Sequence, residues 1–117
     1  MKIVKVIRAI INNPQNISDI LRDKAEIFFE YRGKYKWSIS KTEEGEYYLH
    51  LYYKGDMNLQ ELSDFTDWEN YSYDSFTSTE LEAFGDGIME ELYTILDHKD
   101  SGVDDIFDDI ISDDMFN

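Results

Sequence analysis

Hydrophobic residues recur with two different periods along this chain, and the change of period constrains its fold more than any other feature of the sequence. In residues 3–11 they recur every three or four positions, which predicts a short amphipathic helix that ends before Pro14. Residues 18–24 show a similar spacing, and we expect a second helix there. From Ile27 onward the period falls to two, which is typical of strands that bury one face.

Three alternating segments follow one another between residues 27 and 53. Their apolar residues are Ile27, Phe29 and Tyr31, then Tyr35, Trp37 and Ile39, then Tyr47, Leu49, Leu51 and Tyr53. Gly33 suits the first position of a tight hairpin turn, and Gly45 suits the end of a four-residue turn. The pattern therefore predicts a three-stranded antiparallel meander.

The pattern is weaker in the middle of the chain. We expect a helical turn at residues 59–65, followed by an aromatic and acidic loop at residues 64–76. Beyond this loop, Thr79 and Glu82 fit a capping box, and apolar spacing predicts a helix that reaches about Leu96.

A last helix is expected to begin near Val103. Its apolar side comprises Val103, Ile106, Phe107, Ile110 and Ile111. Together the elements predict a single α+β domain, residues 1–117, in which a three-stranded antiparallel sheet packs against N-terminal and C-terminal helices.

Charge is distributed very unevenly along the chain, whose 26 acidic and 11 basic residues give a net charge of −15. Residues 1–54 hold ten Lys and Arg against seven acids, a net charge of +3. Residues 55–117 hold one Lys against nineteen acids, a net charge of −18. Such an acidic half repels phosphate, so we expect neither direct nucleic-acid binding nor association with anionic membranes.

The composition favours a cytoplasmic protein. There is no cysteine, so disulfides and Cys-based zinc sites are excluded. Lys5 and Arg8 interrupt the apolar residues near the N-terminus, where a secretory signal needs an unbroken apolar run. No apolar run approaches the ~20 residues that cross a bilayer. We expect the protein to act in the cytoplasm of a host cell.

The last predicted helix has an unusual polar side, which consists of aspartates. Asp104, Asp105, Asp108 and Asp109 cover this side, and Asp113 and Asp114 follow at the C-terminal end of the helix. Pairs such as Asp104 and Asp108 place like charges one turn apart, which costs about 0.2–0.5 kcal/mol each. The six charges span ~16 Å at 1.5 Å per residue, about one charge per 2.7 Å. Duplex DNA carries one per ~1.7 Å. A locally unfavourable arrangement of this kind indicates a binding function.

In this charge density the segment from Asp56 to Asp114 resembles the small acidic DNA-mimic inhibitors, including the anti-CRISPR and anti-restriction proteins of phages. The resemblance implies a non-enzymatic protein that binds a basic nucleic-acid-binding protein, such as a nuclease or effector complex, without a cofactor or metal. The predicted partner-binding residues are Asp104, Asp105, Asp108, Asp109, Asp113, Asp114, Asp64, Asp67, Trp68 and Glu69. The sequence leaves the oligomeric state open.

Two other function classes stay open. An immunity protein or antitoxin that neutralises a toxin nuclease would use the same acidic face. A calcium-responsive module or an enzyme is the remote alternative: residues 97–108 match a calcium loop in part, with Asp97 first and an acid last. Lys99 occupies the third ligand position, so we expect no calcium site there. We find no catalytic motif.

The outer face of the meander mixes basic and aromatic side chains. Its residues are Phe28, Arg32, Lys34, Lys36, Tyr48, His50 and Tyr52. Such a face can stack and clamp single-stranded nucleic acid. Because the whole chain is acidic, we favour a face that is solvated or covered by the chain's own acidic half, with a surface-exposed His50.

Overall fold

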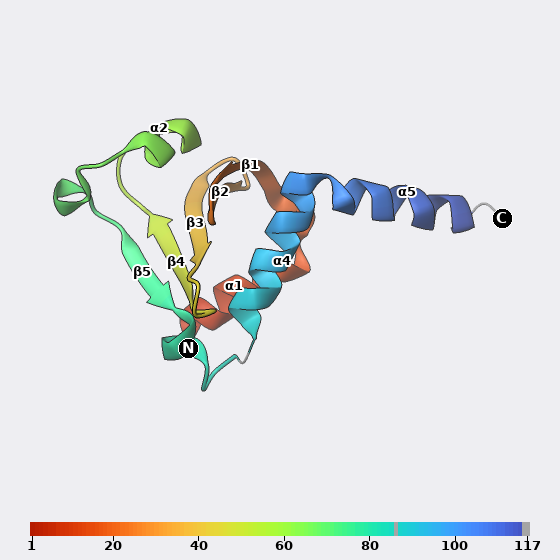
Figure 1. Ribbon diagram of the computed structural model, residues 1–117, viewed down its shortest axis with the longest axis horizontal. Helices are drawn as coiled ribbons and strands as arrows, with labels where there is room; N and C mark the ends of the chain where they lie inside the picture. The colour runs from red at the N-terminus through yellow and green to blue at the C-terminus, as the bar shows by residue number, and fades with distance from the viewer. Residues whose placement is uncertain (86, 116–117) are drawn as a thin grey trace.

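The computed structural model describes residues 1–85 and 87–115, and its centre is a five-stranded antiparallel sheet (Figure 1). The strands are neighbours in chain order, β1-β2-β3-β4-β5. Their bounds are β1 Ile17–Asp23, β2 Glu26–Tyr31, β3 Tyr35–Lys41, β4 Tyr47–Tyr52 and β5 Asp74–Thr77. The α+β class and the antiparallel meander are confirmed, but the sheet has two more strands than the predicted three.

Helices lie on both faces of this sheet. α1 and α4 pack together over one face, and the short α2 lies over the other. The helical bounds are α1 Lys2–Asn12, α2 Leu59–Asp64, α3 Ser78–Leu81, α4 Ile88–Ser101 and α5 Val103–Met115, with 3-10 turns η1 Pro14–Asn16 and η2 Trp68–Asn70. No helix in the described ranges combines the length and apolar character needed to span a membrane.

The main core lies between the sheet and the pair α1 and α4. Alternate strand residues point into it, and Ile27, Phe29, Ile39 and Leu49 are completely buried there. Because α1 and α4 each present one apolar face, this face of the sheet obeys the alternation read from the sequence.

A second, smaller core covers the opposite face of the sheet. Phe28 and Tyr52, expected on an open outer face, are only 2% and 8% exposed, under Leu59 and Leu62 of α2. Asn58 caps α2: its side chain accepts from the backbone N–H of Glu61, whose carboxylate accepts from the backbone N–H of Asn58. The acidic half of the chain therefore covers the sheet.

The predicted helix at residues 18–24 is wrong, because this segment is the edge strand β1. A register shift between Ile17 and Asp19 inserts one extra residue, so Ile17 and Ile20 both face the main core although they lie three apart. Leu21 faces the second core. A bulged strand with both faces covered thus imitates the apolar spacing of a helix.

The helix predicted to reach Leu96 is broken into two pieces. α3 ends at Leu81 and α4 begins only at Ile88, after Gly87 takes a left-handed conformation with φ of 71°. The predicted capping box is also displaced, since Thr77 accepts from the backbone N–H of Glu80. The preceding residues form β5, a four-residue strand too short for its alternation to be recognised.

Candidate partner-binding surfaces

The helix α5 projects from the body of the molecule (Figure 1). α4 ends at Ser101, and Gly102 adopts a left-handed conformation with φ of 82°, which lets the chain turn before α5 begins at Val103. α5 extends along the longest dimension of the molecule, which measures 56 Å against 33 and 27 Å. Both of its long sides are consequently accessible over most of its length.

The acidic face of α5 is formed by Asp104, Asp105, Asp108 and Asp109, opposite its apolar residues, and the predicted Asp113 and Asp114 follow in the last turn of the same helix. Five of the six aspartates are exposed, whereas Asp104 is half-buried with its Oδ2 at 3.8 Å from Lys99 Nζ. The sequence of α5 contains no basic residue. The helix therefore carries acidic side chains from its first turn to its last, and Lys99 partly compensates the charge of Asp104.

The apolar face of α5, made of Ile106, Phe107, Ile110 and Ile111, does not join either core. These side chains are 48–62% exposed. Phe107 lies edge-on to His98 of α4, with ring centroids 5.8 Å apart. The expected packing of C-terminal helices on the sheet holds for α4, while α5 leaves its apolar face in solvent.

The other predicted partner-binding residues lie around η2, at the opposite end of the long axis from α5 (Figure 1). Trp68 is half-buried in an aromatic cluster, with its ring centroid 5.5 Å from Tyr52 and 4.9 Å from Phe65. Three exposed acids surround this cluster, namely Asp64, Asp67 and Glu69. The ten predicted residues therefore form two separate surfaces, and Trp68 acts mainly as a cover for the sheet.

A pocket of about 190 Å³ with a mixed polar and aromatic lining lies beside that aromatic cluster, and the sequence did not reveal it. The hydroxyl of the fully buried Ser38 donates to Glu26 Oε2 at 2.7 Å and lies 2.6 Å from the Tyr52 hydroxyl. His50 is half-buried beside them, so the expectation of a surface histidine is wrong. Among the described residues its Nδ1 finds no hydrogen-bond partner.

Burial shifts the pKa values of two side chains in this pocket, Tyr52 and His50. It raises the pKa of Tyr52 far above its usual value, although the hydrogen bond with Ser38 opposes this shift. Burial lowers the pKa of His50, with the nearby charge of Glu26 acting in the opposite direction. Both side chains are therefore held in their neutral forms. The hydrogen bonds of Ser38 with Glu26 and Tyr52 stabilise the second core.

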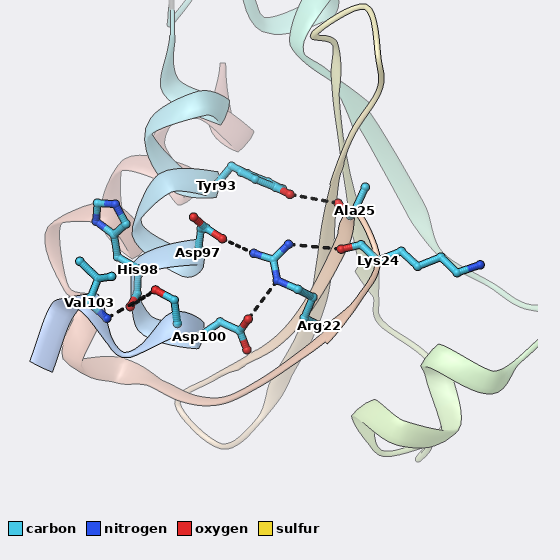
Figure 2. Close-up of polar contacts among 9 residues, drawn as sticks. Arg22, Lys24, Ala25, Tyr93, Asp97, His98, Asp100 and Val103 are labelled. Carbon is cyan, nitrogen blue, oxygen red and sulfur yellow. Dashed lines mark hydrogen bonds and ion pairs between the residues drawn. The ribbon is translucent and has the colours of Figure 1, made fainter.

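The segment that resembled a calcium loop is almost entirely helical. It runs from the end of α4 through Gly102 into α5, so its acids are divided between two helices and do not lie in one ion-binding loop. Asp97 and Asp100 instead bind the guanidinium group of Arg22 on β1, as Figure 2 shows. In residues 1–85 and 87–115, no group of three or more His, Cys, Asp or Glu side chains is placed to hold a metal ion.

A cleft of about 700 Å³ opens between α1 and the sheet, and its lining is predominantly apolar. This α1 cleft is lined by residues that include Ile3, Val6, Ala9, Tyr35, Trp37 and Phe76. Trp37 is only 5% exposed, and its Nε1 has no hydrogen-bond partner in the described part of the chain. The volume lies within the range of about 300–1,000 Å³ that is common for binding sites.

Comparison with known proteins provides no relative from which a function could be transferred. No family model matches the chain, and no curated protein and no solved structure matches it either. The observations that bear on function are thus the chain's own charge distribution and its exposed surfaces.

Proposed function

We propose that this protein is a non-enzymatic inhibitor that binds a basic nucleic-acid-handling protein, such as a nuclease, through the acidic face of α5. One observation carries the proposal: a helix without a basic residue projects from the body and exposes its aspartates along its length. A partner that normally holds nucleic acid offers a groove lined with cations. The projecting helix can enter such a groove without a clash from the rest of the fold.

The charge spacing supports a nucleic-acid mimic over a general acidic surface. At 1.5 Å rise per residue, six aspartates between residues 104 and 114 give about one negative charge per 2.7 Å, against one per ~1.7 Å in duplex DNA. The half of the chain that contains α5 is acidic as a whole, with a net charge of −18 over residues 55–117. Long-range attraction would accelerate encounter with a basic partner.

Packing within the fold does not explain why α5 carries closely spaced aspartates on one side and exposed apolar side chains on the other. Its aspartates repel one another along the helix, and its apolar side chains are largely exposed. Solubility alone would be served as well by mixed charges. A helix that is unfavourable on both faces in the isolated chain is best explained by contacts made outside it.

The test compares two variants that remove the same charge at opposite ends of the molecule. The first carries Asp104→Asn, Asp105→Asn, Asp108→Asn and Asp109→Asn on α5. The matched control carries Asp64→Asn, Asp67→Asn, Glu69→Gln and Asp74→Asn around η2 and β5. Affinity capture from host lysate at low and high salt identifies the partner, which is then purified for titration calorimetry with each variant.

We expect the α5 variant to bind its partner about 1–4 kcal/mol more weakly, because each of four ion pairs at the surface contributes about 0.2–1 kcal/mol. Its association should also lose most of its salt dependence, while the control retains both properties. Duplex DNA should compete with the original protein. Unchanged affinity of the α5 variant, or failure of DNA to compete, would contradict the proposal. A loss confined to the control would place the contact at the aromatic loop.

A further inference from the structure

We propose that the apolar face of α5 packs into the α1 cleft of a second copy of this chain, so that two copies exchange their C-terminal helices. This dimer does not depend on the proposed inhibitory function. It pairs two apolar surfaces that the described structure leaves accessible, the apolar face of α5 and the α1 cleft. Contiguous exposed apolar patches on small proteins commonly mark interaction sites.

A chain's own α5 is not positioned to fill its own cleft. α5 leaves the body at the C-terminal end of α4, whereas α1 begins near the other end of α4, beside α3 (Figure 1). The α1 cleft is lined by the first three turns of α1 and by Leu81 of α3. α5 points away from that region, so a helix that enters the cleft must come from another molecule.

Charge complementarity favours the α1 cleft as the binding site for α5, because α5 is acidic and α1 is basic. α1 carries Lys2, Lys5 and Arg8 and no acid, and all three cations are exposed. Lys34 Nζ lies 5.2 Å from the ring centroid of Tyr35, which lines the cleft. Glu80 is the acidic exception among the lining residues. Lys2 and Glu80 offset one another in the lining, so the positive charge that favours α5 comes mainly from Lys5 and Arg8 on α1 and from Lys34 beside Tyr35.

Direct pairing of two α5 helices is disfavoured by the same charges. Each copy would bring six aspartates and no cation to the seam. Like charges that face one another across a helix pair oppose association. Packing on the basic α1 avoids this repulsion and leaves the acidic face of α5 toward the rim and solvent.

If each copy both donates its α5 and receives the α5 of its partner, the association stops at a dimer and does not grow into a chain of molecules. One copy donates its helix to the cleft and receives its partner's helix in return, which gives a two-fold symmetric dimer. Each dimer then contains the helix-in-cleft contact twice. Doubling the contact helps the pair reach the interface of about 1,200–2,000 Å² that is typical of specific complexes.

Sedimentation equilibrium of the full-length protein over a concentration series tests the proposal, and we expect a dimer. An α5 variant, Ile106→Ser with Ile110→Ser, should raise the dimer dissociation constant about tenfold or more. Both side chains are more than half exposed, so this variant should keep the monomer fold. Ala9 lines the cleft from an exposed position, and Ala9→Glu should weaken the dimer by repelling α5. The matched variant Ala9→Lys has a similar size and the opposite charge, and it should leave the dimer intact.

The decisive experiment mixes the two variants that weaken the dimer, the α5 variant and the Ala9→Glu variant. The α5 variant keeps a normal cleft and the Ala9→Glu variant keeps a normal α5, so one native contact can form between them. We expect heterodimers in the mixture at concentrations where each variant alone is monomeric. A monomeric original protein overturns the proposal. A dimer that Ala9→Glu leaves unchanged also overturns it, because that result indicates pairing between two α5 helices. A monomer that retains a small apolar ligand in native mass spectrometry overturns it as well, because the ligand then occupies the cleft.

Discussion

Arg22 on β1 donates a hydrogen bond from Nε to Oδ2 of Asp100, near the C-terminal end of α4, across 2.9 Å. Asp97, one helical turn earlier, binds the same guanidinium group, and Arg22 also donates to the carbonyl of Lys24 at 3.2 Å (Figure 2). Tyr93 adds a hydrogen bond to the carbonyl of Ala25 at 3.3 Å. These contacts fasten the edge strand of the sheet to the helix from which α5 projects.

Replacing Arg22 by Met should lower the free energy of unfolding by about 1 kcal/mol, since two partly exposed ion pairs are lost and two carboxylates are left side by side. Urea unfolding at low and high salt measures the effect, which should shrink as salt screens the pairs. Lys24→Met is the control, because it removes a cation from the neighbouring exposed turn and keeps both ion pairs. Equal losses in both variants would show that the Arg22 contacts add nothing specific.

Calcium should not bind with micromolar affinity at residues 97–108. Asp97 is engaged by Arg22, and Lys99 Nζ lies 3.8 Å from Asp104 Oδ2, so a cation already occupies this part of the surface. Titration calorimetry should give no saturable heat, and Asp97→Ala should lower stability instead of changing calcium affinity. A site for one ion per chain that Asp97→Ala abolishes would contradict this prediction.

His50 should make the fold lose stability in mild acid. Burial lowers its pKa below the ordinary value of 6.5, so the unfolded chain takes up the proton first as the pH falls. The contribution of a neutral His50 is therefore complete above pH 6.5 and is lost as the pH drops toward its folded pKa. Urea unfolding from about pH 7 to pH 5 should show a decrease in the original protein relative to His50→Gln. Parallel pH profiles would show that His50 titrates normally.

Gly55 and Gly45 form a matched pair of left-handed positions, both with φ of 87°. A Cβ at Gly55 would lie 2.7 Å from the hydroxyl of Tyr71, which donates to the carbonyl of Lys54, whereas a Cβ at Gly45 would meet no heavy atom within 4 Å among the described residues. Ala at either position costs about 1–2 kcal/mol in backbone strain. Gly55→Ala should cost measurably more in thermal unfolding. Equal losses would mean that Tyr71 moves aside freely.

Features that depend on local pattern could be predicted from the amino-acid sequence. The apolar spacing of α1, the alternation of β2 to β4, the turn at residues 59–65 that became α2 and the start of α5 at Val103 all appear as predicted. Each of these elements buries one face, or carries one apolar face, so its period is visible in the chain. The concentration of acids in residues 55–117 is likewise a property of composition.

The segments that cover each apolar face could not be predicted from the sequence, because they depend on contacts in the folded chain. The bulge in β1 and its two covered faces gave it a helical spacing, and the cover formed by α2 and Trp68 buried Phe28 and enclosed His50. The same holds for α5: its amphipathic pattern is evident in the sequence, but the turn at Gly102 carries the helix away from the sheet. Hydrophobic periodicity reports that a face is apolar, whereas the contact that buries it depends on segments far apart in the chain.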